Sequence, residues 1–178
     1  MGAERACPGR VPGGSKRRRD RRFHLRSARR IMTATDDPAL TALFDAASAA
    51  RARAYAPYSG FHVAAALSTP DGAIFCGVNV ENASYPVGTC AEAGAIAAMA
   101  LSGARRIAAI LILGDGEGLT TPCGACRQRI LEFSDGGDVE VFVAGPMGVR
   151  ARFSARALLP AAFGPDFAAR KTPAQDKT

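Results

Sequence analysis

The stretch Ile107-Ala108-Ala109-Ile110-Leu111-Ile112-Leu113 is an uninterrupted apolar run, and it decides the fold class. Seven apolar residues in a row, closed by Gly114-Asp115-Gly116, are typical of a strand that is buried on both faces. A strand of this kind lies inside a sheet that has other elements packed against each side. The run therefore predicts an α/β protein with a central covered sheet.

The sequence on either side of this run predicts the elements that cover and extend the sheet. Asp36-Asp37-Pro38 is typical of a helix start, with Asp as the cap and Pro in the first turn. Asp71-Gly72 predicts a hairpin turn between two strands. The full set is a helix after residue 37, strands over 61–68 and 74–80, a helix over 90–102, a strand over 107–113, a helix over 123–133, and strands over 139–143 and 151–154. This order predicts a mixed β-sheet of about five strands covered by helices.

Length and composition favour one domain with its own core. The chain has 178 residues, of which 48% are apolar, and it contains no Trp. No apolar run approaches the roughly 18–20 residues that a membrane span needs. We therefore expect no membrane partner. The odd number of cysteines with a Cys-x-x-Cys pair indicates intracellular metal or redox chemistry, and we expect a cytoplasmic location.

The positive charge of the chain is confined to its first residues. The net charge is +7, but residues 1–31 carry eleven Lys or Arg and two acids, a net +9, so the remainder is mildly acidic at −2. We expect 1–31 to be a disordered basic tail, 32–170 the folded domain and 171–178 a flexible end. A run such as Lys16-Arg17-Arg18-Arg19 fits nucleic-acid binding or a targeting segment. The favoured interpretation is that translation starts at Met32, which leads directly into the first predicted helix.

Three of the five cysteines have the spacing of metal ligands. Cys90-Ala91-Glu92 is followed, 33 positions after Cys90, by Pro122-Cys123-Gly124-Ala125-Cys126, and both pieces fall at predicted helix starts. Helix N-termini carry free N–H groups and a partial positive charge, which make thiolates available. Three thiols fit a catalytic zinc site, which keeps one position open for water.

At the level of sequence, the three cysteines and Glu92 each have a second interpretation. A closed structural zinc site would need a fourth ligand, and Cys7, His24, His62 and Cys76 supply candidates. Glu92 is either a first-turn acid that favours the helix dipole or a general acid and base beside an activated water. The role of Glu92 as general acid and base matches the signature of zinc deaminases. In that signature a His or Cys ligand is followed two positions later by Glu, and Pro-Cys-x-x-Cys comes further along the chain.

Five blocks between about Tyr55 and Asp166 resemble the short cytidine deaminases. They are Pro57-Tyr58-Ser59-Gly60-Phe61, the stretch Gly77-Val78-Asn79-Val80-Glu81-Asn82-Ala83-Ser84-Tyr85-Pro86, Thr89-Cys90-Ala91-Glu92, Pro122-Cys123-Gly124-Ala125-Cys126-Arg127-Gln128, and Leu158-Leu159-Pro160-Ala161-Ala162-Phe163-Gly164-Pro165. The resemblance implies a three-layer fold, a homotetramer, and hydrolysis of cytidine and 2'-deoxycytidine to uridine and 2'-deoxyuridine in pyrimidine salvage.

The resemblance also implies a role for individual residues. Cys90, Cys123 and Cys126 would ligate one zinc ion, and Glu92 would shuttle the protons. The substrate-binding residues would be Phe61, Asn79, Glu81, Tyr85, Ala91 and Phe163, with Asn79 and Glu81 on the ribose and Phe163 reaching a neighbouring subunit's site. Taken without the resemblance, Asn79 and Glu81 are ordinary turn residues and Phe61 and Phe163 ordinary core residues.

The sequence departs from the family pattern at two places. Ala93 stands where an Arg usually follows the catalytic Glu, and His62-Val63-Ala64 replaces a stretch in which Gly is common.

Two other functions compete with the one that the resemblance implies. One is deamination of a modified aminopyrimidine nucleoside, and the other is a structural zinc module that binds nucleic acid through the basic tail. We expect the substrate to be a small-molecule nucleoside. We expect no nucleic-acid partner, because residues 32–178 carry a net negative charge and a phosphate backbone requires basic residues.

Overall fold

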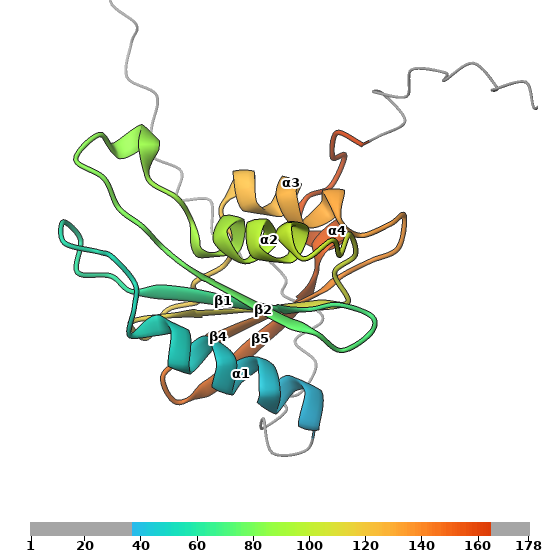
Figure 1. Cartoon of the computed structure of the whole chain (residues 1–178), viewed down its shortest axis with the longest axis horizontal. Coiled ribbons are helices and arrows are strands. Elements are labelled where there is room, and N and C mark those ends of the chain that lie inside the picture. The colour runs from blue at the N-terminus through green and yellow to red at the C-terminus, as the bar shows by residue number, and fades with distance from the viewer. Residues whose placement is uncertain (1–36, 165–178) are drawn as a thin grey trace, which may run out of the picture.

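The computed structural model describes residues 37–164, which form a sheet with helices on both faces (Figure 1). The elements are α1 (Pro38–Arg51), β1 (Val63–Ser68), β2 (Ile74–Val78), η2 (Tyr85–Val87), α2 (Ala91–Leu101), β3 (Ala109–Gly114), α3 (Gly124–Glu132), β4 (Glu140–Gly145), β5 (Gly148–Ser154) and α4 (Ala155–Leu158). The predicted mixed sheet of five strands is confirmed. The expected domain boundaries near residues 31 and 170 lie outside the described residues.

The strand order β2-β1-β3-β4-β5 places the predicted central run in the middle of the sheet. β1 is antiparallel to both β2 and β3, and β5 is antiparallel to β4, whereas β3 and β4 are parallel. Parallel strands cannot be joined by a tight turn, so the chain returns from β3 to β4 through a helix, α3. This crossover brings the start of α3 to the end of the sheet where β3 finishes.

The sheet separates two apolar cores, as the helices on its two faces in Figure 1 indicate. Ile110 and Ile112 of β3 belong to the core that contains residues of α2 and α3. Leu111 and Leu113 belong to the core under α1. All four are at most 1% exposed, so β3 is covered on both faces, as an uninterrupted apolar run predicts.

The predicted elements are all present, and the differences lie at their ends. Asp37 caps α1 and Pro38 is its first residue, as expected. The strand predicted from residue 61 begins at Val63, whose N–H is bound by the side chain of Asn79 and not by a backbone carbonyl. β5 is longer than the predicted 151–154, because its pairing with β4 continues through a bulge to the tight turn at Gly148. Neither η2 nor α4 was predicted, since three or four residues are too few to show a helical period.

Gly77 of β2 allows α2 to lie directly on the sheet. A Cβ atom at this position would lie 2.2 Å from the backbone N of Ala95 and 2.3 Å from the carbonyl O of Ala91. These distances are far inside van der Waals contact, and both atoms belong to the backbone, which cannot swing aside. The absence of a side chain at Gly77 therefore sets the height of α2, and with it the position of the residues at its N-terminus.

Asp115 ties together three segments at the end of β3. Its carboxylate accepts hydrogen bonds from the Arg51 guanidinium of α1 and, at 2.9 Å, from the backbone N–H of His62, and it lies 3.1 Å from Nδ1 of the His62 ring. Burial acts to raise the pKa of Asp115, but the contacts with His62 and Arg51 outweigh it and hold the pKa below its ordinary value. The unusual His62 is thus fixed through Asp115.

We expect Asp115→Asn to lower the free energy of unfolding by about 1–3 kcal/mol at pH 7, because it removes the charge from a carboxylate that accepts several hydrogen bonds. A carboxyl group with a depressed pKa stabilises the fold above its unfolded-state pKa and loses this effect as the pH falls through the folded-state value. The difference between variant and parent should therefore shrink below pH 3.8.

Urea or thermal unfolding between pH 7 and pH 3 measures this difference. Asp45→Asn, at an exposed position of α1, is the matched control and should change stability little. A stability loss in Asp115→Asn that is the same at every pH would contradict the assignment of the effect to the ionised carboxylate.

Candidate active site

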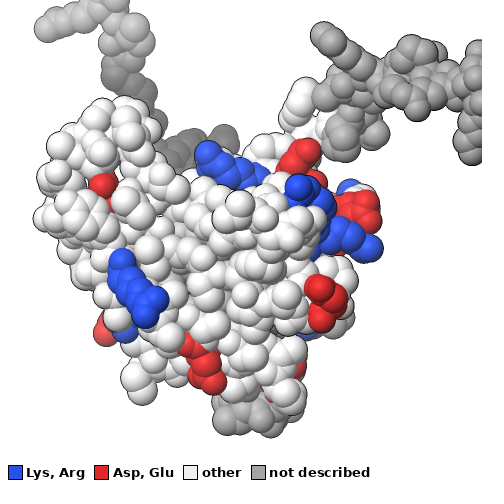
Figure 2. Space-filling model, viewed as in Figure 1, with Lys and Arg blue, Asp and Glu red and all other residues white. Residues whose placement is uncertain are grey.

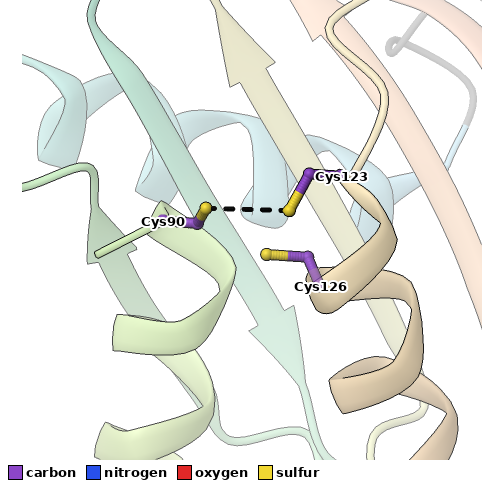
Figure 3. A group of neighbouring side chains, drawn as sticks. All are labelled: Cys90, Cys123 and Cys126. Atoms are coloured by element: carbon purple, nitrogen blue, oxygen red, sulfur yellow. Dashed lines mark hydrogen bonds between the residues drawn. The ribbon is translucent and has the colours of Figure 1, made fainter. Parts of the chain in front are cut away.

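Three thiols converge where the N-termini of two helices meet (Figure 3). Cys90 is the N-cap of α2, Cys123 is the N-cap of α3, and Cys126 lies in the first turn of α3. Their Sγ atoms all lie within 4.8 Å of one another, and those of Cys90 and Cys123 are 3.8 Å apart. Two helices that are separate in the sequence therefore direct their positive ends at one cluster of sulfur atoms.

The cluster fits a zinc ion. Four ligands in a tetrahedron with Zn–S bonds of about 2.3 Å place two sulfurs about 3.8 Å apart, which is the separation found between Cys90 and Cys123. Within residues 37–164 the cluster consists of these three thiols, and neither His62 nor Cys76 belongs to it. The described residues thus supply three ligands, the number of a catalytic zinc site with one open position.

The environment of the thiols differs from one to the next. Burial, followed by the charge of Glu92, raises the pKa of Cys126, and burial also raises the pKa of Cys90. At Cys123 burial acts in the same direction, but the backbone N–H of Cys126 and other hydrogen bonds outweigh it and lower the pKa. The free N–H groups at the start of α3 therefore favour the thiolate form of Cys123.

Glu92 is a buried carboxylate at the edge of this cluster. It is the second residue of α2 and is only 4% exposed. It follows Cys90 by two residues at the N-terminus of the helix that Cys90 caps, and its charge acts to raise the pKa of Cys90 and Cys126. A carboxylate kept out of bulk water beside a metal site can exchange protons with a molecule bound there.

An open hollow of about 470 Å³ leads to the cluster at Cys90. Its lining residues come from the turn before β1, from the end of β2 and from the loop that precedes α2; they are Tyr58, Ser59, Asn79, Val80, Glu81, Asn82, Tyr85, Gly88, Thr89 and Cys90. This volume lies within the range of small-molecule sites. Of the predicted substrate-binding residues, Asn79, Glu81 and Tyr85 lie on its wall.

Asn79 and Glu81 hold the wall of the hollow together. The Asn79 side chain accepts a hydrogen bond of 2.9 Å from the N–H of Val63 and donates one of 2.9 Å to the carbonyl of Phe61. The Glu81 carboxylate accepts bonds from the N–H groups of Tyr58 and Ser59 and from the Ser59 hydroxyl. Asn79 and Glu81 therefore hydrogen-bond to the segment before β1, as expected of ordinary turn residues, and both also line the hollow.

The other predicted substrate-binding residues lie around the hollow in different ways. The ring of Tyr85, on η2, is 77% exposed and makes an edge-to-face contact of 6.3 Å with Tyr58 across the opening. Ala91, which lies between Cys90 and Glu92 in the sequence, is buried. Phe61, in the segment before β1, is 40% exposed. Phe163 is 63% exposed and is not part of the wall, but its carbonyl accepts a 2.8 Å bond from the Gln128 side chain. Phe61, Ala91 and Phe163 do not line the hollow.

Several wall residues carried no individual prediction from the sequence. Tyr58, Ser59, Asn82 and Thr89 fall inside the blocks quoted above, but a block gives no reason to single out one member. The signal that points to Ser59 is the contact of its hydroxyl with Glu81, 22 positions away. A contact between two loops at that separation is visible only in the folded chain.

A thiol cluster with an open ligand position, next to a buried glutamate that is not itself a ligand, is the arrangement of the zinc-dependent deaminases. The fold and the site define a protein of this class. The family model described as the cytidine and deoxycytidylate deaminase zinc-binding region matches residues 39–143, more than half of the chain, and the chain belongs to this family.

Individual relatives agree with this placement. A cytidine deaminase from Sporosarcina psychrophila is 42% identical over 114 residues, which cover 64% of this chain and 83% of that protein. The crystal structure of cytidine deaminase from Burkholderia pseudomallei has 48% identity and a TM-score of 0.65 and covers 69% of this chain and 98% of its own. That of the Mycobacterium tuberculosis enzyme has 36% identity and a TM-score of 0.60, covering 72% and 99%.

We expect alanine at Cys90, Cys123 or Cys126 to reduce bound zinc well below the roughly one ion per chain of the parent, because two remaining thiolates are too few to hold it tightly. Metal analysis by mass spectrometry after gel filtration measures the ratio. Cys76→Ala, at a half-buried position of β2, is the matched control and should keep its zinc. Full zinc occupancy in all three variants would contradict the assignment.

Proposed function

We propose that the chain catalyses the zinc-dependent hydrolytic deamination of cytidine and 2'-deoxycytidine, giving uridine and 2'-deoxyuridine in pyrimidine salvage. The observation that carries this proposal is the buried carboxylate of Glu92 beside three thiols, at the end of a hollow large enough for a nucleoside. The relatives reported above are themselves cytidine deaminases.

Cys90, Cys123 and Cys126 would hold the zinc ion, which supplies the Lewis acidity that makes a water molecule nucleophilic near neutral pH. Glu92 takes the proton of the water that adds to C4 of the pyrimidine. It passes this proton to N3. It then takes the second proton from the hydroxyl now on C4 and delivers it to the amino group, which departs as ammonia and leaves a carbonyl at C4. One carboxylate serves each step because it stands in the first turn of the helix that Cys90 caps and is shielded from bulk water.

The wall of the hollow binds the sugar in this proposal. Asn79 and Glu81 present an amide and a carboxylate on the same side, and polar groups that are already positioned reject ligands that lack the matching hydroxyl groups. Tyr58 and Tyr85, whose rings meet edge to face, line the hollow and would cover one side of a bound ligand.

The charges of the described residues support a small nucleoside over a polynucleotide. On the face shown in Figure 2, Lys and Arg are interspersed with Asp and Glu and form no continuous basic stripe. A phosphate backbone requires such a stripe. No helix in residues 37–164 is both long and apolar enough to cross a membrane. We also propose a cytoplasmic location, where the three thiols of the cluster would stay reduced and able to bind zinc.

We expect Glu92→Gln to lose at least about 10³-fold in kcat and to keep its zinc and its melting temperature, because the amide preserves the shape of the buried side chain but cannot shuttle protons. Loss of the cytosine absorbance measures turnover, with and without a chelator. Glu117→Gln, at an exposed loop position, is the matched control and should keep the parent rate. Turnover within tenfold of the parent in Glu92→Gln would reject the assignment.

We also propose a homotetramer in which Phe163 completes a neighbouring subunit's site. Large apolar side chains are exposed around the hollow: Tyr55, Tyr58, Val80, Tyr85 and Val87 are each between 46% and 77% exposed. The projecting loop that carries η2 is almost free of charged side chains (Figure 2). Apolar surface of this kind is costly in water and is typical of a subunit interface.

We expect light scattering to give the mass of four chains, and Phe163→Ala to raise KM with little change in zinc. Met147→Ala, at a side chain that is 94% exposed in the β4–β5 turn, is the control. Mixed tetramers test the sharing of sites. At cytidine concentrations well below KM, Phe163→Ala and Glu92→Gln subunits, each impaired alone, should together recover up to about a quarter of the parent rate. An active monomer, or no recovery in the mixture, would contradict the proposal.

A further inference from the structure

Ser59 lies at the centre of the hydrogen bonds that shape the hollow. It sits in the turn before β1 and lines the hollow together with Asn79 and Glu81. The N–H of Phe61 donates a bond of 3.0 Å to the Ser59 hydroxyl oxygen, and the same hydroxyl donates its proton to Oε1 of Glu81. Because the N–H of Phe61 occupies a lone pair of this oxygen, the hydroxyl proton is left to point at Glu81.

The two oxygens of Glu81 are held in different ways. Oε2 accepts the backbone N–H groups of Tyr58, at 2.9 Å, and of Ser59, at 3.1 Å. Within the described residues, Oε1 accepts one hydrogen bond, from the Ser59 hydroxyl. A carboxylate has about four acceptor positions, so three are filled and one remains, on the oxygen that Ser59 orients.

We infer that Ser59 is a positioning residue for substrate: its hydroxyl fixes Oε1 of Glu81 so that the remaining acceptor position receives a sugar hydroxyl of the nucleoside. This rests on the proposed function. Ser59 itself touches none of the reacting atoms, so its contribution falls on affinity and not on the chemical step. The same hydroxyl is the main cause of the lowered pKa of Glu81, which keeps the carboxylate an acceptor without a proton of its own.

The backbone bonds to Oε2 separate this role from a general role in folding. Without the Ser59 hydroxyl, Glu81 remains tethered to the turn through the N–H groups of Tyr58 and Ser59. The turn therefore keeps its connection to the end of β2, while the carboxylate gains freedom to rotate about that tether. The expected loss is confined to ligands that carry the hydroxyl which Oε1 receives.

The test measures steady-state KM and kcat of the zinc-loaded parent, Ser59→Ala and Ser59→Thr with two substrates, cytidine and 2',3'-dideoxycytidine. The second substrate keeps the 5'-hydroxyl group but lacks the 2'- and 3'-hydroxyl groups, one of which donates to Oε1 of Glu81 in the inferred complex. We expect Ser59→Ala to raise KM for cytidine about tenfold with kcat within twofold, and to change KM for the dideoxynucleoside less than twofold. Ser59→Thr, which keeps a hydroxyl on the same carbon, should recover most of the affinity for cytidine.

Ser48→Ala, at an exposed position of α1, is the matched control and should behave as the parent. An unchanged KM for cytidine in Ser59→Ala, or an equal rise for both substrates, would overturn the inference; the second result would make Ser59 a support of the turn in general. Calorimetric binding of cytidine separates this inference from the proposed function. A parent that binds cytidine without deaminating it refutes the function alone, and equal affinity in parent and Ser59→Ala refutes the inference.

Discussion

The contact on which the rest of the site depends is that between Gly77 and the backbone of α2. A methyl group at Gly77 would overlap the backbone of Ala91 and Ala95, so no other residue permits the helix to lie this close to the sheet. Gly94 lies opposite Gly77, where a Cβ atom would come to within 3.4 Å of the Gly77 Cα, an ordinary van der Waals contact. The depth of α2 in turn sets where Cys90 and Glu92 stand relative to α3.

The site concentrates negative charge, and two helix N-termini offset it. Three thiolates and the carboxylate of Glu92 would lie near one another, with Cys126 and Glu92 buried, Cys90 partly buried and Cys123 exposed. The guanidinium of Arg127, which directly follows Cys126, binds backbone carbonyls: Nε donates to the carbonyl of Pro122 and Nη1 to that of Leu158. Arg127 thereby joins α3 to the C-terminal segment. With Ala93 in place of an Arg, the positive ends of α2 and α3 face the thiols.

The wall of the hollow shows that one residue can serve both folding and binding. Asn79 uses its amide to bridge the start of β1, and Glu81 uses most of its carboxylate to bind the preceding turn. Neither residue is thereby removed from the hollow, because each retains an acceptor or donor that is not used. Groups held in place before a ligand arrives cost less ordering on binding than mobile ones.

The sequence by itself determined the class of fold and pointed to the three thiols and to Glu92, the residues on which the proposed mechanism rests. Each of these follows from local pattern: an apolar run for β3, an Asp-Pro start for α1, and Cys-x-x-Cys and Cys-x-Glu at helix starts. The tertiary structure decided what depends on contacts between distant segments. The order of the strands, the approach of α2 at Gly77, the 3.8 Å between the sulfurs of Cys90 and Cys123, and the bond from Ser59 to Glu81 join residues far apart in the chain. Periodicity and spacing describe neighbours along the chain, whereas these contacts follow from how whole elements pack.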